Sequence, residues 1–260
     1  MTANPDTLFP KGAALVLGGS GGVGSAICEE LVRNGVPVVF TYKTNADRAQ
    51  ALAKDLLDAG GQATACPADL SDPASLSACV EQVIRLHGRL HSVYIAIGYD
   101  IPQVPIAELT PELWQAVLRA DAEGVFNAIY ATLPTMREAG GGNYVHISSA
   151  GLLRYPPLDI LSVAPKAAIE ELIKGVAKEE GHHNIRANSI AIGVIETGIF
   201  LRLREQGVFD DHWVESVQKN LPLRRFGRPA EVARMALFLG SNLSAYTTGQ
   251  LIPVDGGYGL

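Results

Sequence analysis

A dense run of glycines close to the start of the chain is the first feature that could carry chemistry. The run, Gly18-Gly19-Ser20-Gly21-Gly22-Val23-Gly24, follows a short apolar stretch and precedes a helical one. Glycines let the chain turn sharply and let a pyrophosphate approach the backbone, while the following helix offers unpaired N–H groups to phosphate oxygens. Two spacings typical of dinucleotide-binding turns fit: Gly19, Gly21 and Gly24, or Gly18, Gly22 and Gly24. The residues expected to contact the phosphates are Gly18, Ser20, Gly22, Val23 and Gly24.

The end of the next apolar run indicates which dinucleotide is bound. An NAD site calls for an acidic residue about twenty residues after the glycines, on the ribose hydroxyls. The run ends instead in Tyr42-Lys43, with no carboxylate before Asp47. Lys43, helped by Arg48, can bind a 2′-phosphate, and Tyr42 can flank the adenosine; the alternative for Lys43 is a solvated surface lysine. The pattern favours NADP(H) over NAD.

A serine and a lysine four residues apart form a second candidate site. Ser162 and Lys166 fall in the helical stretch 159–180, where this spacing puts both side chains on one face, so they can touch the same ligand. A serine hydroxyl is far less acidic than a phenol, whose pKa is about 10, so a nearby ammonium group cannot poise it as a proton relay near neutral pH. We therefore interpret Ser162 as a hydrogen-bonding or space-making residue.

The elements that must position these residues alternate along the chain. Uniformly apolar runs predict strands at 13–17, 37–42, 62–67, 90–97, 142–148, 186–192 and 250–254. Amphipathic stretches predict helices at 22–34, 46–59, 72–86, 111–139, 159–180 and 229–239. The pattern predicts one α/β domain over residues 1–260, a Rossmann-like doubly wound parallel sheet with helices on both faces. Short helical pieces at 197–225 interrupt the alternation and predict a substrate lid.

Composition excludes several classes of protein. With 260 residues, 47% of them hydrophobic and 18% charged, the chain is typical of a globular protein and not of a disordered one. A net charge of −6 argues against nucleic-acid or anionic-membrane partners. The sequence shows neither a signal segment in its first ten residues nor an apolar run long enough to span a membrane. Cys28, Cys66 and Cys79 show no paired spacing, so we expect three thiols in a reducing, cytoplasmic compartment.

Further motifs follow in order along almost the whole chain. After the Gly18/Gly22/Gly24 turn come Asp69-Leu70, Ser148-Ser149, Ser162-Val163-Ala164-Pro165-Lys166, and the segments 192–197, 225–232 and 248–257. With these motifs the chain resembles the short-chain dehydrogenase/reductase family. The resemblance implies a nicotinamide cofactor, with Asp69 at the adenine and Lys166 at the nicotinamide ribose. The other cofactor-binding residues that it implies are Leu70, Gly98, Ile195 and Thr197.

The chain departs from this family in the residues that handle the proton. Members of the family use an asparagine, a serine that holds the substrate oxygen, a tyrosine that passes the proton and a lysine. An ungapped register puts Asp121, Ser149, Ser162 and Lys166 at these positions, so a serine replaces the tyrosine. Asp121 acts through its main chain or pairs with Lys166.

With a serine at the tyrosine position, a different side chain would have to supply the proton to the substrate. Tyr155, in the loop after the fifth predicted strand, and Tyr99 are phenols that could reach the nicotinamide site; alternatively both only line the pocket. His146 lies among apolar neighbours on a predicted strand and is expected to be a core residue. The adjacent His182 and His183 have no carboxylate or cysteine nearby and make a poor metal site, so no metal is expected.

Three functions follow from these observations. The first is an NADP(H)-dependent oxidoreductase that reduces a carbonyl, ketone or 3-oxoacyl-like, by hydride transfer, with Ser149, Ser162, Lys166 and Tyr155 at the reacting centre. The second is a reductase of a conjugated C=C bond of the enoyl or dienoyl type, because an enolate needs less help from a positioned acid. The third is a catalytically impaired NADP-binding sensor or structural protein. The predicted lid favours a medium-sized apolar substrate, and the resemblance implies a homotetramer assembled through helices 111–139 and 159–180.

Overall fold

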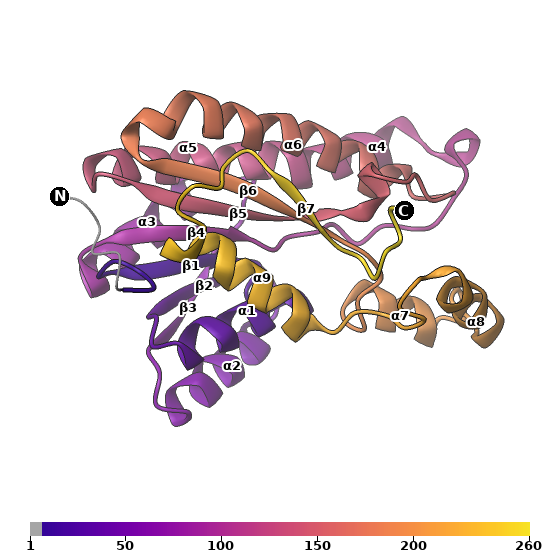
Figure 1. Ribbon diagram of the computed structural model, residues 1–260, viewed down its shortest axis with the longest axis horizontal. Coiled ribbons are helices and arrows are strands. Elements are labelled where there is room, and N and C mark those ends of the chain that lie inside the picture. The colour runs from indigo at the N-terminus through magenta and orange to yellow at the C-terminus, as the bar shows by residue number, and fades with distance from the viewer. Residues whose placement is uncertain (1–6) are drawn as a thin grey trace.

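Within the part of the chain that the structure describes, seven parallel strands form a single sheet in the order β3-β2-β1-β4-β5-β6-β7 (Figure 1). The structure is a computed structural model that describes residues 7–260, so the expected absence of a signal segment falls partly outside the described residues. The strands are β1 (Ala13–Leu17), β2 (Val38–Tyr42), β3 (Ala63–Pro67), β4 (Leu90–Ile95), β5 (Gly142–Ser149), β6 (Ile185–Ile192) and β7 (Leu251–Val254). The strand order reverses between β1 and β4, and ligands of such sheets bind at the carboxyl ends beside this reversal.

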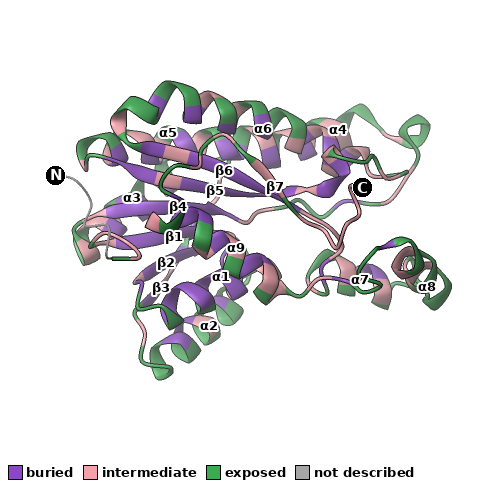
Figure 2. Ribbon diagram, viewed as in Figure 1, coloured by how far each residue is buried: buried purple, intermediate pink, exposed green. Residues whose placement is uncertain are grey.

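Helices cover both faces of the sheet, as predicted. One layer holds α1 (Gly22–Arg33), α2 (Ala46–Asp58) and α9 (Pro229–Gly240), and the other is built mainly from α3 (Pro73–His87), α5 (Gly124–Glu138) and α6 (Ile160–Glu180) (Figure 1). Alternate residues of β1 enter the two cores: Leu15 packs with the α3/α5/α6 layer and Val16 with the α1/α2/α9 layer. Because both faces are covered, β1 is buried throughout, and this explains its uniformly apolar sequence (Figure 2).

The predicted helix 111–139 is not continuous. It consists of α4 (Pro111–Leu118), a π-helical turn over Arg119–Glu123, and α5. Such wide turns within α-helices occur frequently at functional sites, and this one contains the buried Asp121. Residue periodicity does not reveal one extra residue in a turn, so the boundary was missed.

Two short helices occupy the segment predicted to be a lid. They are α7 (Ile199–Glu205) and α8 (Asp211–Asn220), and they lie beyond the carboxyl ends of the strands (Figure 1). Phe209 stacks on Trp213 with ring centroids 3.8 Å apart, and Phe200 meets Phe226 edge-on at 5.0 Å. Aromatic contacts therefore tie both helices to the segment that leads into α9.

The cysteines differ from the expectation. Cys66 at the end of β3 and Cys79 in α3 form a disulfide, with Cα atoms 6.2 Å apart, so the prediction of three thiols is wrong for this pair. Cys28 stays a free thiol, and burial raises its pKa. The pairing depends on how α3 packs over β3, which spacing alone does not show. Among the described helices, none is both long and apolar enough to cross a membrane.

Candidate active site

The residues singled out by the sequence gather at the carboxyl ends of the strands. The glycine turn follows β1, Gly98 follows β4, Ser149 ends β5, and Thr197 lies between β6 and α7. A parallel sheet brings these ends to the same edge, beside the reversal of strand order. The same edge therefore carries both the phosphate-binding candidates and the serine expected to hold the substrate.

The glycine turn is packed so closely that Gly18, Gly22 and Gly24 leave no room for a side chain. A Cβ on Gly22 would lie 1.8 Å from Thr197 Oγ1, and one on Gly24 would lie 2.2 Å from the Gly18 carbonyl oxygen. Gly18 itself has a φ of +73°, and its Cβ would lie 2.6 Å from the Ala96 oxygen. A Cβ on Gly21 would be less restricted, 3.1 Å from the Gly18 oxygen. A Cβ on Gly19 would lie 2.4 Å from Phe40 Cβ, so packing distinguishes the two frames only at Gly21.

The start of α1 fits an anionic group. Gly21 is the N-cap and provides no capping side chain, and the first turn holds no acidic residue. Helix N-termini carry a partial positive charge and unpaired N–H groups, which suits a pyrophosphate. The residues of the turn thus fit the phosphates of a dinucleotide.

Lys43, the candidate for binding the adenosine end of the cofactor, is paired with a carboxylate. Lys43 Nζ lies 2.9 Å from Asp69 Oδ2, and hydrogen bonds from Lys43 and Ser71 lower the pKa of Asp69 to about 2. The Lys43 side chain keeps 64% of its surface exposed, so a phosphate can still reach its ammonium group. A 2′-phosphate bound here would share Lys43 with Asp69. Tyr42 is half-buried beside it, in register with Pro67 of β3.

The other cofactor-binding candidates line the same edge. The Leu70 carbonyl accepts a hydrogen bond from Asn127 Nδ2 at 2.9 Å, which ties the loop after β3 to α5. Ile195 is buried and pairs through its backbone with Gly227. A Cβ on Gly98, by contrast, would meet nothing within 4 Å. Steric restriction therefore explains glycine at the turn after β1 but not at Gly98.

Ser149 is oriented by its own loop. Its Oγ accepts a hydrogen bond from the Gly151 N–H at 3.0 Å, at the start of a 3₁₀ turn over Ala150–Leu152. Because the oxygen acts as the acceptor here, the hydroxyl proton remains for a substrate oxygen. This geometry suits a residue that binds a carbonyl group.

The Asp121 carboxylate pairs with Lys166, the second of the two alternatives left open by the sequence. Its Oδ2 lies 3.8 Å from Lys166 Nζ, and its Oδ1 accepts a hydrogen bond from the Tyr99 N–H at 3.1 Å. Burial raises the pKa of Asp121, while Lys166 and the Tyr99 N–H oppose the shift. The carboxylate thus pairs with the lysine and also anchors the loop after β4.

A buried polar pair lies one helical turn beyond Lys166. Glu170 Oε1 is 3.1 Å from His146 Nδ1, and the Ser189 hydroxyl lies 3.4 Å from the same nitrogen. Burial lowers the pKa of His146; burial alone would raise that of Glu170, but its contacts with His146 lower it overall. His146 is a buried core residue, as predicted, and sequence reasoning missed its partner.

Two further polar residues near Ser162 were also missed. Asp159 is the N-cap residue of α6, and its Oδ1 accepts a hydrogen bond from Gln103 Nε2 at 3.3 Å. Burial raises the pKa of Asp159, and Gln103, Lys166 and Ser162 oppose the shift. Tyr258, near the end of the chain, has its pKa raised by burial and by Asp159. An acidic residue three positions before Ser162, at a helix start, was the available signal.

Comparison with known proteins identifies the family. Residues 18–259 match a family model described as Enoyl-(Acyl carrier protein) reductase. The chain is 33% identical over 253 residues to the 3-oxoacyl-(acyl-carrier-protein) reductase FabG of Chlamydia muridarum, covering 97% of this chain and 99% of that protein. The chain belongs to the short-chain dehydrogenase/reductase family. The family predicted from the motifs is thereby confirmed.

Solved structures of the family agree with this fold. A short-chain type dehydrogenase/reductase from Mycobacterium ulcerans superposes with a TM-score of 0.91 at 28% identity, covering 97% of this chain and 91% of that one. A gluconate 5-dehydrogenase from Burkholderia cenocepacia, solved in complex with NADP and tartrate, gives a TM-score of 0.88 at 27% identity and covers 98% of each chain. The Rossmann-like fold of the short-chain dehydrogenase/reductases is thus shown for this chain.

The two tyrosines considered as replacement acids lie at the surface. Tyr155 is 49% exposed and Tyr99 is 39% exposed. In the described part of the chain the Tyr155 hydroxyl has no hydrogen-bond partner, and Tyr99 contributes its N–H rather than its phenol to the site. The role of Tyr155 stays a prediction.

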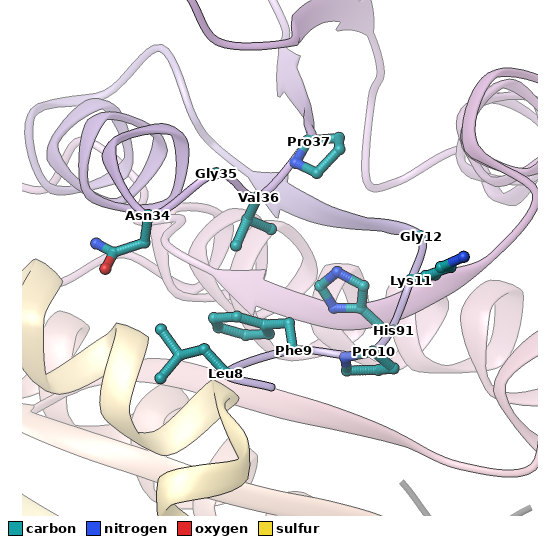
Figure 3. A pocket seen from close by; sticks show the side chains of 10 residues that line it. All are labelled: Leu8, Phe9, Pro10, Lys11, Gly12, Asn34, Gly35, Val36, Pro37 and His91. Atoms are coloured by element: carbon teal, nitrogen blue, oxygen red, sulfur yellow. The ribbon is translucent and has the colours of Figure 1, made fainter. Parts of the chain in front are cut away.

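Two pockets of similar size lie in different places. One, of about 400 Å³, lies between the loop after β4, which contributes Asp100 and Gln103, and α7, which contributes Arg202 and Leu203. The other, of about 380 Å³, lies at the amino ends of the strands, next to Phe9 and the buried His91 (Figure 3). Only the first borders the candidate active site.

Proposed function

We propose that this protein is an NADP(H)-dependent oxidoreductase that reduces a carbonyl group, of a ketone or a 3-oxoacyl-like substrate. The observation that carries the proposal is the joint presence of the glycine turn, Ser149 and Lys166 at one edge of the sheet. The name of the Chlamydia muridarum relative, a 3-oxoacyl reductase, supports the same reaction. A bound nicotinamide would supply the hydride.

The phosphorylated form of the cofactor is supported by the end of β2. Lys43 is exposed at the position where NAD-binding sites hold a carboxylate, and Tyr42 lies next to it. The related gluconate 5-dehydrogenase was solved with NADP. The Asp69 carboxylate forms an ion pair with Lys43 and would remain at the adenine side. The solvent-exposed side of the Lys43 ammonium group would bind the 2′-phosphate.

The chain's own residues would position the substrate. The Ser149 hydroxyl donates a hydrogen bond to the carbonyl oxygen. Ser162 offers a second hydroxyl from the face of α6 that also carries Lys166. Lys166 binds the nicotinamide ribose and is itself held by Asp121. Hydrogen bonds aimed at the oxygen stabilise the negative charge that develops there.

A second candidate reaction is reduction of a conjugated C=C bond. Two observations favour it: the matching family model is described as an enoyl reductase, and Ser162 stands where the family's tyrosine would be. An enolate product requires stabilisation by Ser149 but less help from a positioned acid. Both reactions would use the same cofactor site.

The substrate is proposed to be medium-sized and mainly apolar. The pocket beside α7 is lined by the apolar side chains of Leu203 and Val208 and by an ion pair between Arg202 and Asp100. Helices α7 and α8 would act as a lid over it. We further propose a cytoplasmic homotetramer, in which neighbouring copies meet through α4, α5 and α6, with no nucleic-acid or membrane partner.

The test is NADPH oxidation, followed by its absorbance, against a panel of ketones, 3-oxoacyl thioesters and enoyl thioesters. Turnover of the carbonyl substrates is expected, with a loss of about 100-fold or more in Ser149→Ala, because one donor to the developing oxyanion is removed. Preferential turnover of the enoyl thioesters would support the second candidate. NADPH binding without turnover of any substrate would contradict both reactions and leave the sensor function.

A further inference from the structure

The proposed carbonyl reduction leaves a proton unaccounted for. Hydride addition to a carbonyl carbon makes an alkoxide, which must receive a proton. The short-chain dehydrogenase/reductase family uses a tyrosine there, whereas this chain has Ser162. A serine hydroxyl is too weak an acid to end the step as the net donor, so a second acid must reprotonate it. The following inference rests on the proposed function.

Asp159 is placed to be that acid. It stands at the start of α6, three residues before Ser162, so the two side chains lie on the same face of the helix. The Ser162 N–H donates a hydrogen bond to the Asp159 carbonyl oxygen at 3.0 Å, and the Ser162 side chain is among the groups that lower the pKa of the Asp159 carboxyl group. Lys166 lies on the next turn of the same face.

The carboxyl group is also adjacent to the substrate pocket. Gln103, which donates a hydrogen bond to Asp159 Oδ1 at 3.3 Å, is one of the residues lining the pocket between the loop after β4 and α7. Asp159 and Ser162 are both half-buried. The carboxyl group therefore lies between the helix serine and the wall of the pocket into which the substrate would bind.

We propose that Asp159 supplies the proton for the reduction, and that the hydroxyl of Ser162 passes it to the product oxygen. Ser162 gives its hydroxyl proton to the alkoxide oxygen, forming the alcohol O–H bond. In the same step the Ser162 oxygen takes the proton from the Asp159 carboxyl group, which becomes a carboxylate. Water then returns a proton to Asp159. The sum is one carbonyl, one hydride from NADPH and one proton giving one alcohol and NADP⁺.

The surroundings of Asp159 keep it protonated at a higher pH than an ordinary aspartate. Burial raises its pKa, and the opposing effects of Gln103, Lys166 and Ser162 do not cancel this. Tyr258 faces Asp159 from the end of the chain, and Arg154 lies 5.6 Å from the Tyr258 ring. Lys166 is the charged side chain that acts on Asp159 directly, and its ammonium group would also stabilise the carboxylate after the proton has left.

Asp121 is less suited to the same task, although burial raises its pKa as well. Its Oδ1 accepts the Tyr99 N–H and its Oδ2 faces Lys166. One oxygen therefore accepts a hydrogen bond and the other forms an ion pair at 3.8 Å, and both contacts favour the ionised carboxylate. Asp121 thus positions Lys166 and the loop after β4.

The first test is the pH dependence of carbonyl reduction in Asp159→Asn. In the wild type, kcat falls as the pH rises through the pKa of Asp159, because the acid form is required. We expect Asp159→Asn to lower kcat by about 100- to 10,000-fold, the range for losing a general acid, and to abolish this fall. Asparagine has nearly the same shape, its Oδ1 can still accept the Gln103 hydrogen bond, and the Asp159 side chain makes no capping hydrogen bond to lose, so the fold and the NADPH affinity should be unchanged. Asp55→Asn, an exposed substitution on α2, serves as the matched control.

A second readout does not depend on turnover. Infrared difference spectra of the cofactor-free protein should show a protonated carboxyl band that titrates above the range of an ordinary aspartate, is lost in Asp159→Asn and is retained in Asp121→Asn. Asp159→Glu, which keeps the acid, should recover part of the activity and the fall of kcat with pH.

The outcomes separate the two proposals. A wild type that reduces no carbonyl would contradict the proposed function, whatever the infrared band shows. An active wild type whose pH profile is the same in Asp159→Asn would overturn the role of Asp159. So would a pH profile that changes in Tyr258→Phe instead, since the acid would then be that phenol.

Discussion

Replacing Lys43 should separate the two forms of the nicotinamide cofactor. A 2′-phosphate carries a charge of about −1.5 to −2 near neutral pH. Two unit charges 4 Å apart interact by about 1 kcal/mol in water, and Lys43 is mostly exposed, so the value for water applies. The doubly charged phosphate then loses about 2 kcal/mol in Lys43→Ala, which corresponds to about 30-fold in Kd.

Fluorescence titration with NADPH and with NADH measures this effect directly. The expected result for Lys43→Ala is a Kd for NADPH raised about 30-fold and a Kd for NADH changed by no more than about 3-fold. Lys54→Ala is the matched control, because Lys54 is also an exposed lysine paired with an aspartate, Asp58, at 2.6 Å. Added salt should reduce the difference between the cofactors, since it screens exposed charges. Equal weakening of both cofactors, or a wild type that prefers NADH, would refute the reasoning.

Three further predictions concern the cradle, the disulfide and the acid stability of the fold. Gly22→Ala should weaken NADPH binding at least about 10-fold in the same titration, because its Cβ would lie 1.8 Å from Thr197 Oγ1, whereas Gly21→Ala should have a much smaller effect. Reducing the disulfide, whose cysteines are 13 residues apart, should cost about 3 kcal/mol in thermal unfolding, and denatured unreduced protein should show one titratable thiol rather than three. Burial lowers the pKa of His91 to about 3, so the folded state binds fewer protons than the unfolded state below about pH 6.5, and stability should fall on acidification. In urea unfolding, His91→Gln should reduce that slope by about 1.4 kcal/mol per pH unit; an unchanged slope would contradict this.

Local patterns were sufficient for the strands and for the phosphate cradle. Residues 13–17 were recognised as a strand because a strand covered on both faces is apolar at every position, and the structure buries all of them. The glycine turn was recognised because its spacing reflects close backbone approaches within a few residues, such as that of Gly24 to Gly18. Both features can be recognised in consecutive residues, although part of the packing that requires them, such as Thr197 against Gly22, comes from distant segments.

Features that depend on packing between distant segments were missed. The disulfide requires α3 to pack over β3, and the π-helical turn at Asp121 shows no interruption of the apolar pattern. A role for Asp159 could not be predicted from its neighbours in the sequence. It depends on the hydrogen bond from Gln103, 56 residues away, and on burial at the pocket wall. Residue types at fixed spacing identify a site's cofactor half more readily than a proton donor that tertiary structure creates.

The most direct test of carbonyl reduction is a competition between a 3-oxoacyl thioester and the enoyl thioester of the same chain length. The enzyme receives both substrates together with NADPH deuterated at the transferable position of nicotinamide C4, and mass spectrometry follows the label. The prediction is that deuterium enters the 3-hydroxyacyl product. Label in the saturated acyl product, or in neither product while the cofactor is bound, would contradict it.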